Sequence, residues 1–258
     1  MKLVIKIGGA ALDDKELVTK FAKTIPSLWR EGHQLVIVHG GGAALSRTLK
    51  QLGCESSFVN GLRVTDAQTR DVAVMVLAGQ INKQLVAAVG AAGQPALGIC
   101  GGDLHMFRAA KKRSELGYVG EICSVDAHWI ERLWNAGIAP VVSSLALGLD
   151  GEYYNINADH MASACAVACG ANALIYLTDV AGVKDAEGTV IRWLDVNAIA
   201  AMVKQETVSG GMLPKLEACT SALKKGVTRV RILPADHAEV LPGFFTHRID
   251  CGTEVIAS

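Results

Sequence analysis

The chain has 258 residues, half of them hydrophobic, and its 25 basic side chains balance 25 acidic ones. A chain of this length can bury a full core as one large domain or two small ones. The balanced charge argues against nucleic acid and acidic membranes as partners, because both attract proteins with an excess of basic residues.

The cysteines and the apolar runs bear on location. Seven scattered cysteines fit a reducing compartment better than a disulfide framework. Cys165 and Cys169 lie four residues apart on a predicted helix without nearby ligands, so we interpret them as core residues rather than metal ligands. No apolar run is long enough to span a membrane, and the N-terminus lacks the layout of a signal peptide. We therefore expect a soluble, cytoplasmic protein.

Apolar strands alternate with amphipathic helices along the chain. In chain order, the predicted elements are a strand over 3–7, a helix over 14–31, a strand over 35–38, helices over 43–52, 66–78 and 80–92, a strand over 96–100, an antiparallel pair over 107–110 and 118–124, a helix over 126–135, a strand over 139–143, a hairpin over 145–154, a helix over 160–169, a strand over 172–178, a helix over 195–205, a helix opened by 209–215, and strands over 229–233 and 253–256. No linker or repeat divides them. The expected fold is one α/β domain over 1–258, a three-layer α/β/α sandwich on a mainly parallel central sheet.

Capping residues predict where several helices begin. We expect Asp13 to cap the first helix, Thr65 with Gln68 to form a capping box for the third, and Asn157 to cap the helix that follows it. These positions fix which side chains stand at helix N-termini, where anions are favoured.

Two glycine-rich turns follow buried strands. Gly8 and Gly9 end the first strand, and the glycines at 40–42 end the second and open a helix. Such turns let a ligand approach the backbone, and a helix N-terminus attracts anions. A tight turn without any ligand is the alternative, but three glycines in a row favour an anion site. Lys6, inside the first strand, also needs a partner. The two turns and this cation predict a polyanion held between two strand ends.

Further polar side chains lie beside predicted helix starts. Arg63 is either a surface arginine that pairs with a carboxylate or a fork that binds a substrate carboxylate. Asp159 fits a structural role in a first helical turn, but that role explains Asn155 and Asn157 beside it less well. Lys215 lies next to a glycine-rich helix start, as a phosphate-binding lysine would.

This set of side chains favours phosphoryl transfer. The sequence has no G-x-x-x-x-G-K-[ST] phosphate loop and no dinucleotide fingerprint. We interpret His39 as a positioning or structural residue, because no nucleophile stands beside it. A carboxylate acceptor is already ionised near pH 7 and needs no base. The obstacle is then repulsion between two anions, which Lys6, Lys215 and backbone N–H groups would relieve.

Six motifs carry a resemblance to a known family. The segments 6–9 (KIGG), 39–42 (HGGG) and 178–183 (TDVAGV) resemble the amino acid kinase family. The segments 60–65 (NGLRVT), 155–159 (NINAD) and 210–215 (GGMLPK) narrow the resemblance to its branch that phosphorylates N-acetyl-L-glutamate. The resemblance covers essentially the whole chain.

The resemblance implies an enzyme of arginine biosynthesis. It would transfer the γ-phosphoryl group of ATP to the side-chain carboxylate of N-acetyl-L-glutamate, with Mg²⁺ held mainly by the nucleotide phosphates and no protein metal site. Lys6 and Lys215 would stabilise the transferred group, and Asp159 would orient both lysines. The other implied contacts are the phosphate-binding Gly8 and Gly9, the substrate-binding Gly41, Gly42, Arg63 and Asn155, and the nucleotide-binding Asp179, Val180, Ala181, Gly182, Val183, Lys184, Thr207, Val208 and Ser209. An N-terminal lobe over 1–170 would bind the acid and a C-terminal lobe over 171–258 the nucleotide.

The sequence departs from its relatives at several places. Phe58 stands where some relatives carry a basic residue, and Gly210 where related chains carry an acidic one. The extra N-terminal helix of arginine-inhibited hexameric relatives is absent from this sequence, so we expect a homodimer insensitive to arginine. Two alternatives stay open: a sister kinase for N-acetylaminoadipate, which is one methylene longer, and a catalytically silent nucleotide sensor.

Overall fold

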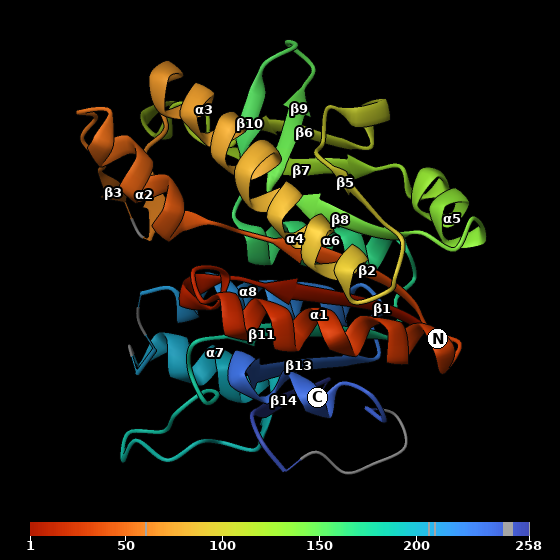
Figure 1. The fold of residues 1–258 in the computed structure, drawn as a ribbon. Helices are drawn as coiled ribbons and strands as arrows, with labels where there is room; N and C mark the ends of the chain where they lie inside the picture. The colour runs from red at the N-terminus through yellow and green to blue at the C-terminus, as the bar shows by residue number, and fades with distance from the viewer. Residues whose placement is uncertain (60, 206, 209, 245–249, 258) are drawn as a thin grey trace.

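Eight short strands form one sheet through the centre of the molecule (Figure 1). The computed structural model describes residues 1–59, 61–205, 207–208, 210–244 and 250–257. In spatial order the strands are β12 (Trp193–Asp195), β14 (Thr253–Ile256), β13 (Arg229–Pro234), β11 (Ala173–Thr178), β1 (Lys2–Ile7), β2 (Gln34–His39), β8 (Ala139–Ser143) and β5 (Ala96–Ile99). Neighbours pair in parallel, except that β13 and β14 are antiparallel. The expected mainly parallel central sheet is confirmed.

Helices cover both faces of this sheet. They are α1 (Lys15–Arg30), α2 (Gly42–Gln51), α3 (Ala67–Ala73), α4 (Asn82–Ala91), α5 (Ala127–Asn135), α6 (Ala158–Ala168), α7 (Val196–Lys204) and α8 (Met212–Lys224). Because side chains alternate along a strand, each strand feeds two cores. In β1, Ile5 packs into the core formed with α1, α2 and α4, whereas Val4 packs into the core formed with α5, α6 and α8. The three-layer sandwich is therefore confirmed.

A smaller sheet lies beside the N-terminal half of the main one. Its order is β10 (Tyr153–Asn155), β9 (Leu145–Gly148), β6 (Phe107–Lys111) and β7 (Gly120–Val125). The predicted antiparallel pair and hairpin are both part of it. The sequence did not predict the hairpin of β3 (Phe58–Val59) and β4 (Leu62–Arg63), whose strands have only two residues each. These small pairings carry Asn155 and Arg63 toward the carboxyl ends of the main strands.

Residues 67–91 form one continuous helix instead of the two predicted ones. Gly79 favours a break, but a π-helical segment, Val74–Ile81, joins α3 to α4 without one. With a mean hydropathy of 1.5, this 25-residue helix is also long and apolar enough to span a membrane, contrary to our expectation of no such run. Val76, Leu77 and Leu85 are nevertheless buried in the core beneath it, as in the central helix of a globular domain.

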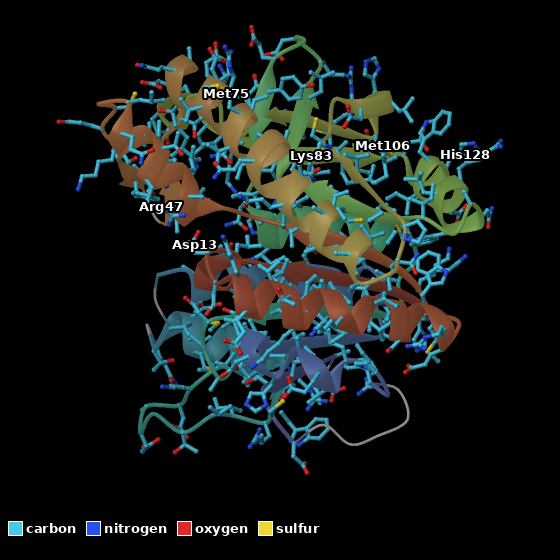
Figure 2. All side chains as sticks on the ribbon, in the orientation of Figure 1. Asp13, Arg47, Met75, Lys83, Met106 and His128 are labelled. Carbon is cyan, nitrogen blue, oxygen red and sulfur yellow. The ribbon has the colours of Figure 1, made fainter. Side chains whose placement is uncertain are left out.

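Helix α1 begins one residue later than predicted. Asp14, not Asp13, is its N-cap, and the Asp14 carboxylate accepts bonds from the backbone N–H groups of Glu16 and Leu17. Asp13 instead pairs with Arg47, whose guanidinium lies 2.6 and 2.7 Å from its two oxygens (Figure 2). The nearby arginine thus holds the carboxylate that the helix does not use.

The predicted capping box of α3 is also wrong. Asp66 caps this helix by accepting a bond from the Thr69 N–H. Thr65 is fully buried, and its hydroxyl donates to the Arg63 carbonyl within its own turn. The predicted cap of α6 is confirmed, since Asn157 accepts from the first-turn N–H groups of Asp159 and His160.

Candidate active site

Three charged side chains meet where β1, α6 and α8 converge. Lys6 Nζ lies 2.9 Å from Asp159 Oδ1, and Lys215 Nζ lies 2.9 Å from Asp159 Oδ2. Only 8% of Lys6 and 6% of each of the other two residues are exposed. A buried charge needs such pairing, because its desolvation is otherwise very costly. Two ammonium groups and one carboxylate leave this charged cluster with a net charge of +1, which an anion would balance.

Local structure brings each member to this point. Lys6 occupies the penultimate position of β1, and Asp159 stands in the first turn of α6 behind its Asn157 cap. Lys215 stands in the first turn of α8, directly after Pro214. Proline suits that turn because the N–H it lacks would have no partner there. The positive ends of two helix dipoles therefore meet at the cluster.

Protonation in the cluster follows from burial and pairing. Burial alone would raise the pKa of Asp159, but the ammonium groups of Lys6 and Lys215 outweigh it and lower that pKa to about 2. The pKa of Lys215 is lowered from its ordinary value by burial and by Lys6, against the opposing effect of Asp159. The Asp159 carboxylate therefore stays ionised, and the protonation of Lys215 depends on its burial and on the charges of Lys6 and Asp159.

The first glycine turn adjoins the cluster. A Cβ on Gly8 would come within 2.5 Å of Lys6 Nζ, so the missing side chain makes room for the ammonium group. Gly9 has a positive φ of 66°, and a Cβ there would lie 3.4 Å from the Asp179 carboxyl group. The ends of β1 and β11 thus lie side by side. The two glycine turns also adjoin each other, because β1 pairs with β2 and places Ile7 opposite His39.

A cavity of about 170 Å³ opens at the second glycine turn. Its lining includes Gly41, Gly42, Arg63, Asn155 and Asn157, so three separate segments of the chain meet there. The four predicted substrate-binding residues all belong to this one cavity, which we call the glycine-loop pocket.

Gly41 determines the shape of this pocket. It precedes α2 with a φ of 158°, and a Cβ there would overlap Ile81 and Leu77 of the π-helical segment. Only glycine avoids that overlap, so the loop can pack closely against the helix. The first-turn N–H groups of α2, which have no partner within the helix, start at this point.

Arg63 is buried, not a surface arginine. Its guanidinium donates to Ser56 Oγ and Ser46 Oγ at 2.6 Å and to the Gly42 carbonyl at 3.2 Å, and it lies 4.6 Å from the ring centre of Phe58. Within the described part of the chain, no carboxylate pairs with it. Burial lowers its pKa below the ordinary value. The alternative of a surface ion pair is therefore wrong, and the guanidinium retains its need for an anion.

Asn155 is held from two sides at the end of β10. Its side-chain amide donates to Thr65 Oγ1 at 3.3 Å, and its backbone N–H donates to the Tyr118 carbonyl. Thr65 is two residues from Arg63, so the hydrogen bond between Asn155 and Thr65 links the two chain segments that carry Asn155 and Arg63.

His39 lies behind the glycine turn and is fully buried. Its Nδ1 is 2.8 Å from the Gly40 carbonyl and its Nε2 is 3.1 Å from the side-chain amide nitrogen of Asn82. A carbonyl accepts and an amide nitrogen donates, so we assign the proton to Nδ1. Burial lowers the pKa of His39 to about 4, and the ring is neutral near pH 7. This geometry fits our interpretation of His39 as a positioning or structural residue.

The predicted nucleotide segment follows β11. Thr178 Oγ1 donates to Asp179 Oδ1, and the Val183 N–H donates to Thr253 Oγ1 at 2.8 Å. At Gly182 and Val183 this segment therefore lies against Thr253, at the start of β14, whereas Lys184 forms an isolated bridge with Val190.

The second predicted nucleotide segment precedes α8. Thr207 bonds back to the Met202 carbonyl, and Val208 lines a cavity of about 590 Å³ together with Gly210 and Pro214. Ser209 lies outside the described residues. The cavity reaches from this segment to the β3–β4 hairpin, between the two predicted lobes.

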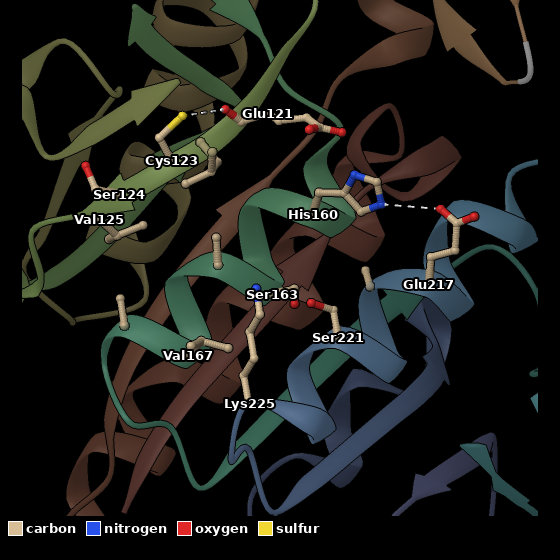
Figure 3. Close-up of a pocket in the computed structure, with 14 residues that line it drawn as sticks. Glu121, Cys123, Ser124, Val125, His160, Ser163, Val167, Glu217, Ser221 and Lys225 are labelled. Atoms are coloured by element: carbon tan, nitrogen blue, oxygen red, sulfur yellow. Dashed lines mark hydrogen bonds and ion pairs between the residues drawn. The ribbon is translucent and has the colours of Figure 1, made fainter. Parts of the chain in front are cut away.

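A further cavity of about 480 Å³ lies between β7, α6 and α8 (Figure 3). Its lining includes His160, whose Nε2 is 3.9 Å from Glu217 Oε2, and Ser163, Ser221 and Lys225. None of the residues predicted for the site lines it.

Sequence reasoning missed several residues that support the site. Ser46 and Ser56 hold Arg63, Asn82 holds His39, and Tyr176 lies under the charged cluster. Serines on a helix face or in a loop give no distinctive pattern. A polar tyrosine within the otherwise apolar run 173–177 is the one signal that could have drawn attention to Tyr176.

Comparisons with known proteins identify the family of this chain. Residues 1–234 match the Amino acid kinase family. Over the full length of both chains, the sequence is 60% identical to an acetylglutamate kinase from Koribacter versatilis and 57% identical to one from Acidobacterium capsulatum.

Solved structures share the fold. The crystal structure of smu.665 from Streptococcus mutans UA159 matches with a TM-score of 0.86 and 28% identity, covering 100% of this chain and 99% of that one. N-acetylglutamate synthase from Neisseria gonorrhoeae, solved with coenzyme A and N-acetyl-glutamate, matches with a TM-score of 0.87 and 25% identity, covering 100% of this chain and 59% of that one. The chain described here belongs to the amino acid kinase family.

Proposed function

We propose that this chain transfers the γ-phosphoryl group of ATP to the side-chain carboxylate of N-acetyl-L-glutamate, a step of arginine biosynthesis. One observation carries the proposal: a buried cluster of net charge +1 stands beside a pocket that contains a buried arginine without a carboxylate partner among the described residues. The acetylglutamate kinases at 57% and 60% identity support the same activity. The synthase that shares the fold was solved with N-acetyl-glutamate, which supports the choice of acid.

We assign the acid to the glycine-loop pocket. Arg63 and Asn155 would hold its α-carboxylate end, because a guanidinium binds a carboxylate through two parallel hydrogen bonds. The backbone at Gly41 and Gly42 would face the rest of the molecule, where no side chain intervenes. This arrangement leaves the side-chain carboxylate of the acid directed toward the charged cluster.

The chemistry requires charge neutralisation more than proton transfer. One oxygen of the ionised acceptor carboxylate forms a bond to the γ-phosphorus, and the bond from that phosphorus to the bridging β,γ-oxygen breaks, releasing ADP. No proton moves, so no general base is needed. Lys6 and Lys215 would face the negative oxygens of the transferred group, while Asp159 keeps both lysines in place.

We assign the nucleotide to the segments 179–184 and 207–209, with Gly8 and Gly9 at its phosphates. The acid would then belong to the lobe over 1–170 and the nucleotide to the lobe over 171–258. Among the described residues no group of three His, Cys, Asp or Glu side chains could hold a metal. Mg²⁺ would therefore take its ligands mainly from the nucleotide phosphates, as this ion commonly does, and would offset their charge.

A homodimer and a cytoplasmic location belong to the same proposal. Only 44% of the most apolar window of helix 67–91 is buried within the chain, and Met75 on this helix is 59% exposed (Figure 2). The exposed side of this helix mixes Met75 with polar side chains such as Gln80 and Lys83. Contact with another subunit suits such a mixed surface, because protein–protein interfaces are about as apolar as the rest of a protein surface. Light scattering at several concentrations tests this: a constant mass of two chains is expected, and a constant mass of one chain would contradict it.

The decisive assay traps the acyl phosphate as a hydroxamate. N-acetylglutamate, free glutamate and N-acetylaminoadipate are compared in parallel, with ATP and Mg²⁺. We expect product with N-acetylglutamate alone. Product with the longer acid only would favour the sister kinase. The two acids differ by one methylene, which a binding site discriminates by only about 1–3 kcal/mol. No product from folded protein that binds ATP would favour the nucleotide sensor.

A further inference from the structure

Beneath the charged cluster lies an aromatic side chain that the proposed mechanism has not used. Tyr176 is in β11, is fully buried, and is the register partner of Lys6 in the neighbouring strand β1. Partners in parallel strands point to the same face of a sheet. The ring therefore lies on the same face as the Lys6 side chain, in the core covered by α6 and α8.

Two further contacts join this side chain to the cluster. Lys215 Nζ lies 5.1 Å from the centre of the Tyr176 ring, within the range of a cation–π interaction. The Tyr176 hydroxyl donates to the backbone carbonyl of Asp159 at 3.2 Å. One residue thus contacts Lys215 through its ring, the Asp159 backbone through its hydroxyl, and neighbours Lys6 through the sheet.

We propose that Tyr176 is a positioning residue of the phosphoryl-transfer site, whose ring keeps the Lys215 ammonium charged and in place while its hydroxyl fixes the first turn of α6. The proposal rests on the proposed kinase function for its catalytic meaning, but the contact itself is independent of that function.

The ammonium group of Lys215 is buried, and burial disfavours its charged form. Burial and the charge of Lys6 both favour loss of the Lys215 proton, and Asp159 divides its attraction between two lysines. The face of an aromatic ring is electron-rich and stabilises a cation without accepting its proton. A buried phenol also stays neutral, because burial raises the pKa of Tyr176 well above its ordinary range. The ring thus favours the charged form of Lys215 and adds no charge of its own.

The test measures the pKa of Lys215 directly, by NMR of lysines labelled at the ε-carbon, with the signal assigned through Lys215→Arg. Tyr176→Phe keeps the ring, and Tyr176→Leu removes it. We expect the Lys215 pKa to stay unchanged in Tyr176→Phe and to fall by about one unit in Tyr176→Leu. Leu174→Val, two residues earlier on the same face of β11, controls for looser packing and should leave that pKa unchanged.

Fluorinated phenylalanines at position 176 keep the shape of the ring while weakening its attraction for cations, so they cover the case in which Tyr176→Leu does not fold. The Lys215 pKa should fall stepwise with fluorination. A Lys215 pKa that stays unchanged both on fluorination and on loss of the ring would overturn the proposal.

Activity gives the second readout. The alkaline limb of the kcat profile should move to lower pH in Tyr176→Leu but not in Tyr176→Phe, with KM for the acid unchanged in both. An unshifted limb in Tyr176→Leu would count against the role in transfer. A wild-type chain without kinase activity would refute the proposed function, while the NMR titration would still decide the contact between ring and ammonium.

Discussion

Two buried sets of charge lie at the same edge of the sheet and are compensated in opposite ways. In the charged cluster, Lys6 and Lys215 share the carboxylate of Asp159, so one of the two positive charges is balanced within the chain. In the glycine-loop pocket, Arg63 has only neutral partners among the described residues, namely two serine hydroxyls and a carbonyl. A compensated site is built before the substrate arrives, whereas an uncompensated one is completed by the substrate. The first arrangement suits catalysis and the second suits binding.

The largest expected effect comes from breaking the compensation. Asp159→Asn leaves two buried ammonium groups without their shared carboxylate, so we predict a loss of about 3–5 kcal/mol in the free energy of unfolding near pH 7. Urea titration measures it. Asp13→Asn, which removes a charge whose partner Arg47 is half exposed, should change stability far less. Equal effects of the two substitutions would show that the cluster is not the buried network described here.

Removing one lysine tests the catalytic half of the comparison. Lys215→Ala takes away a cation that faces the transferred group, and we predict a fall in kcat of about 10²–10³-fold with little change in KM for the acid. Steady-state kinetics with the hydroxamate assay measure both constants. Lys224→Ala, on an exposed position of the same helix, is the matched control. A change confined to KM would contradict the assignment.

The binding half depends on the shape of the guanidinium group. Arg63→Lys keeps the charge but loses the two-pronged geometry and the stacking on Phe58. We predict that KM for N-acetylglutamate rises about 10–100-fold, the equivalent of roughly 1–3 kcal/mol for a hydrogen bond to a charged group, while kcat changes much less. Arg47→Lys, at an exposed pair, should leave both constants unchanged. A large fall in kcat with constant KM would show that Arg63 acts in phosphoryl transfer and not in binding the acid.

The smallest expected effect concerns His39, a buried polar group that is kept neutral. Its native pKa of about 4 lies below the ordinary value of 6.5, so only the unfolded chain binds a proton between these values. The contribution to stability is therefore complete above pH 6.5 and is lost as the pH falls toward 4. Between pH 7 and pH 5.5 we predict a loss of about 1 kcal/mol.

Urea titration at the two pH values measures this loss. His33 and His160 also have lowered pKa values and act in the same direction, so the contribution of His39 is the difference that His39→Gln removes. An identical pH dependence in that variant would show that His39 does not stay neutral in the native state.

The fold was largely predictable because its main strands are apolar runs of usable length. The strands β3 and β4 were missed because two residues each are too few to show an alternating pattern, although they pair with each other in a local hairpin. The three-residue strand β12 was missed because pairing with the distant β14, not local pattern, makes it a strand. The sequence also predicted two helices, over 66–78 and 80–92, where the structure has one. Leu77 and Ile81 pack over the glycine turn at Gly41, and the π-helical segment joins α3 to α4 without a break.

The sequence predicted more of the charged cluster than of the contacts that hold Arg63. Lys6 inside a strand requires a buried partner, and that need is visible in the sequence alone. The identity of the partner, Asp159, came from the resemblance, because 153 positions of chain separate residues 6 and 159. Ser46 and Ser56 were missed because a serine that holds an arginine looks like any surface serine until the chain is folded.

The most direct test of the division between binding and catalysis is calorimetric titration of N-acetylglutamate into three proteins: wild type, Arg63→Lys and Lys215→Ala. We predict that Lys215→Ala binds the acid about as tightly as wild type although its turnover is nearly lost. We predict that Arg63→Lys binds the acid about 10–100-fold more weakly but still turns over at saturation. Weak binding by Lys215→Ala together with unchanged binding by Arg63→Lys would contradict the account.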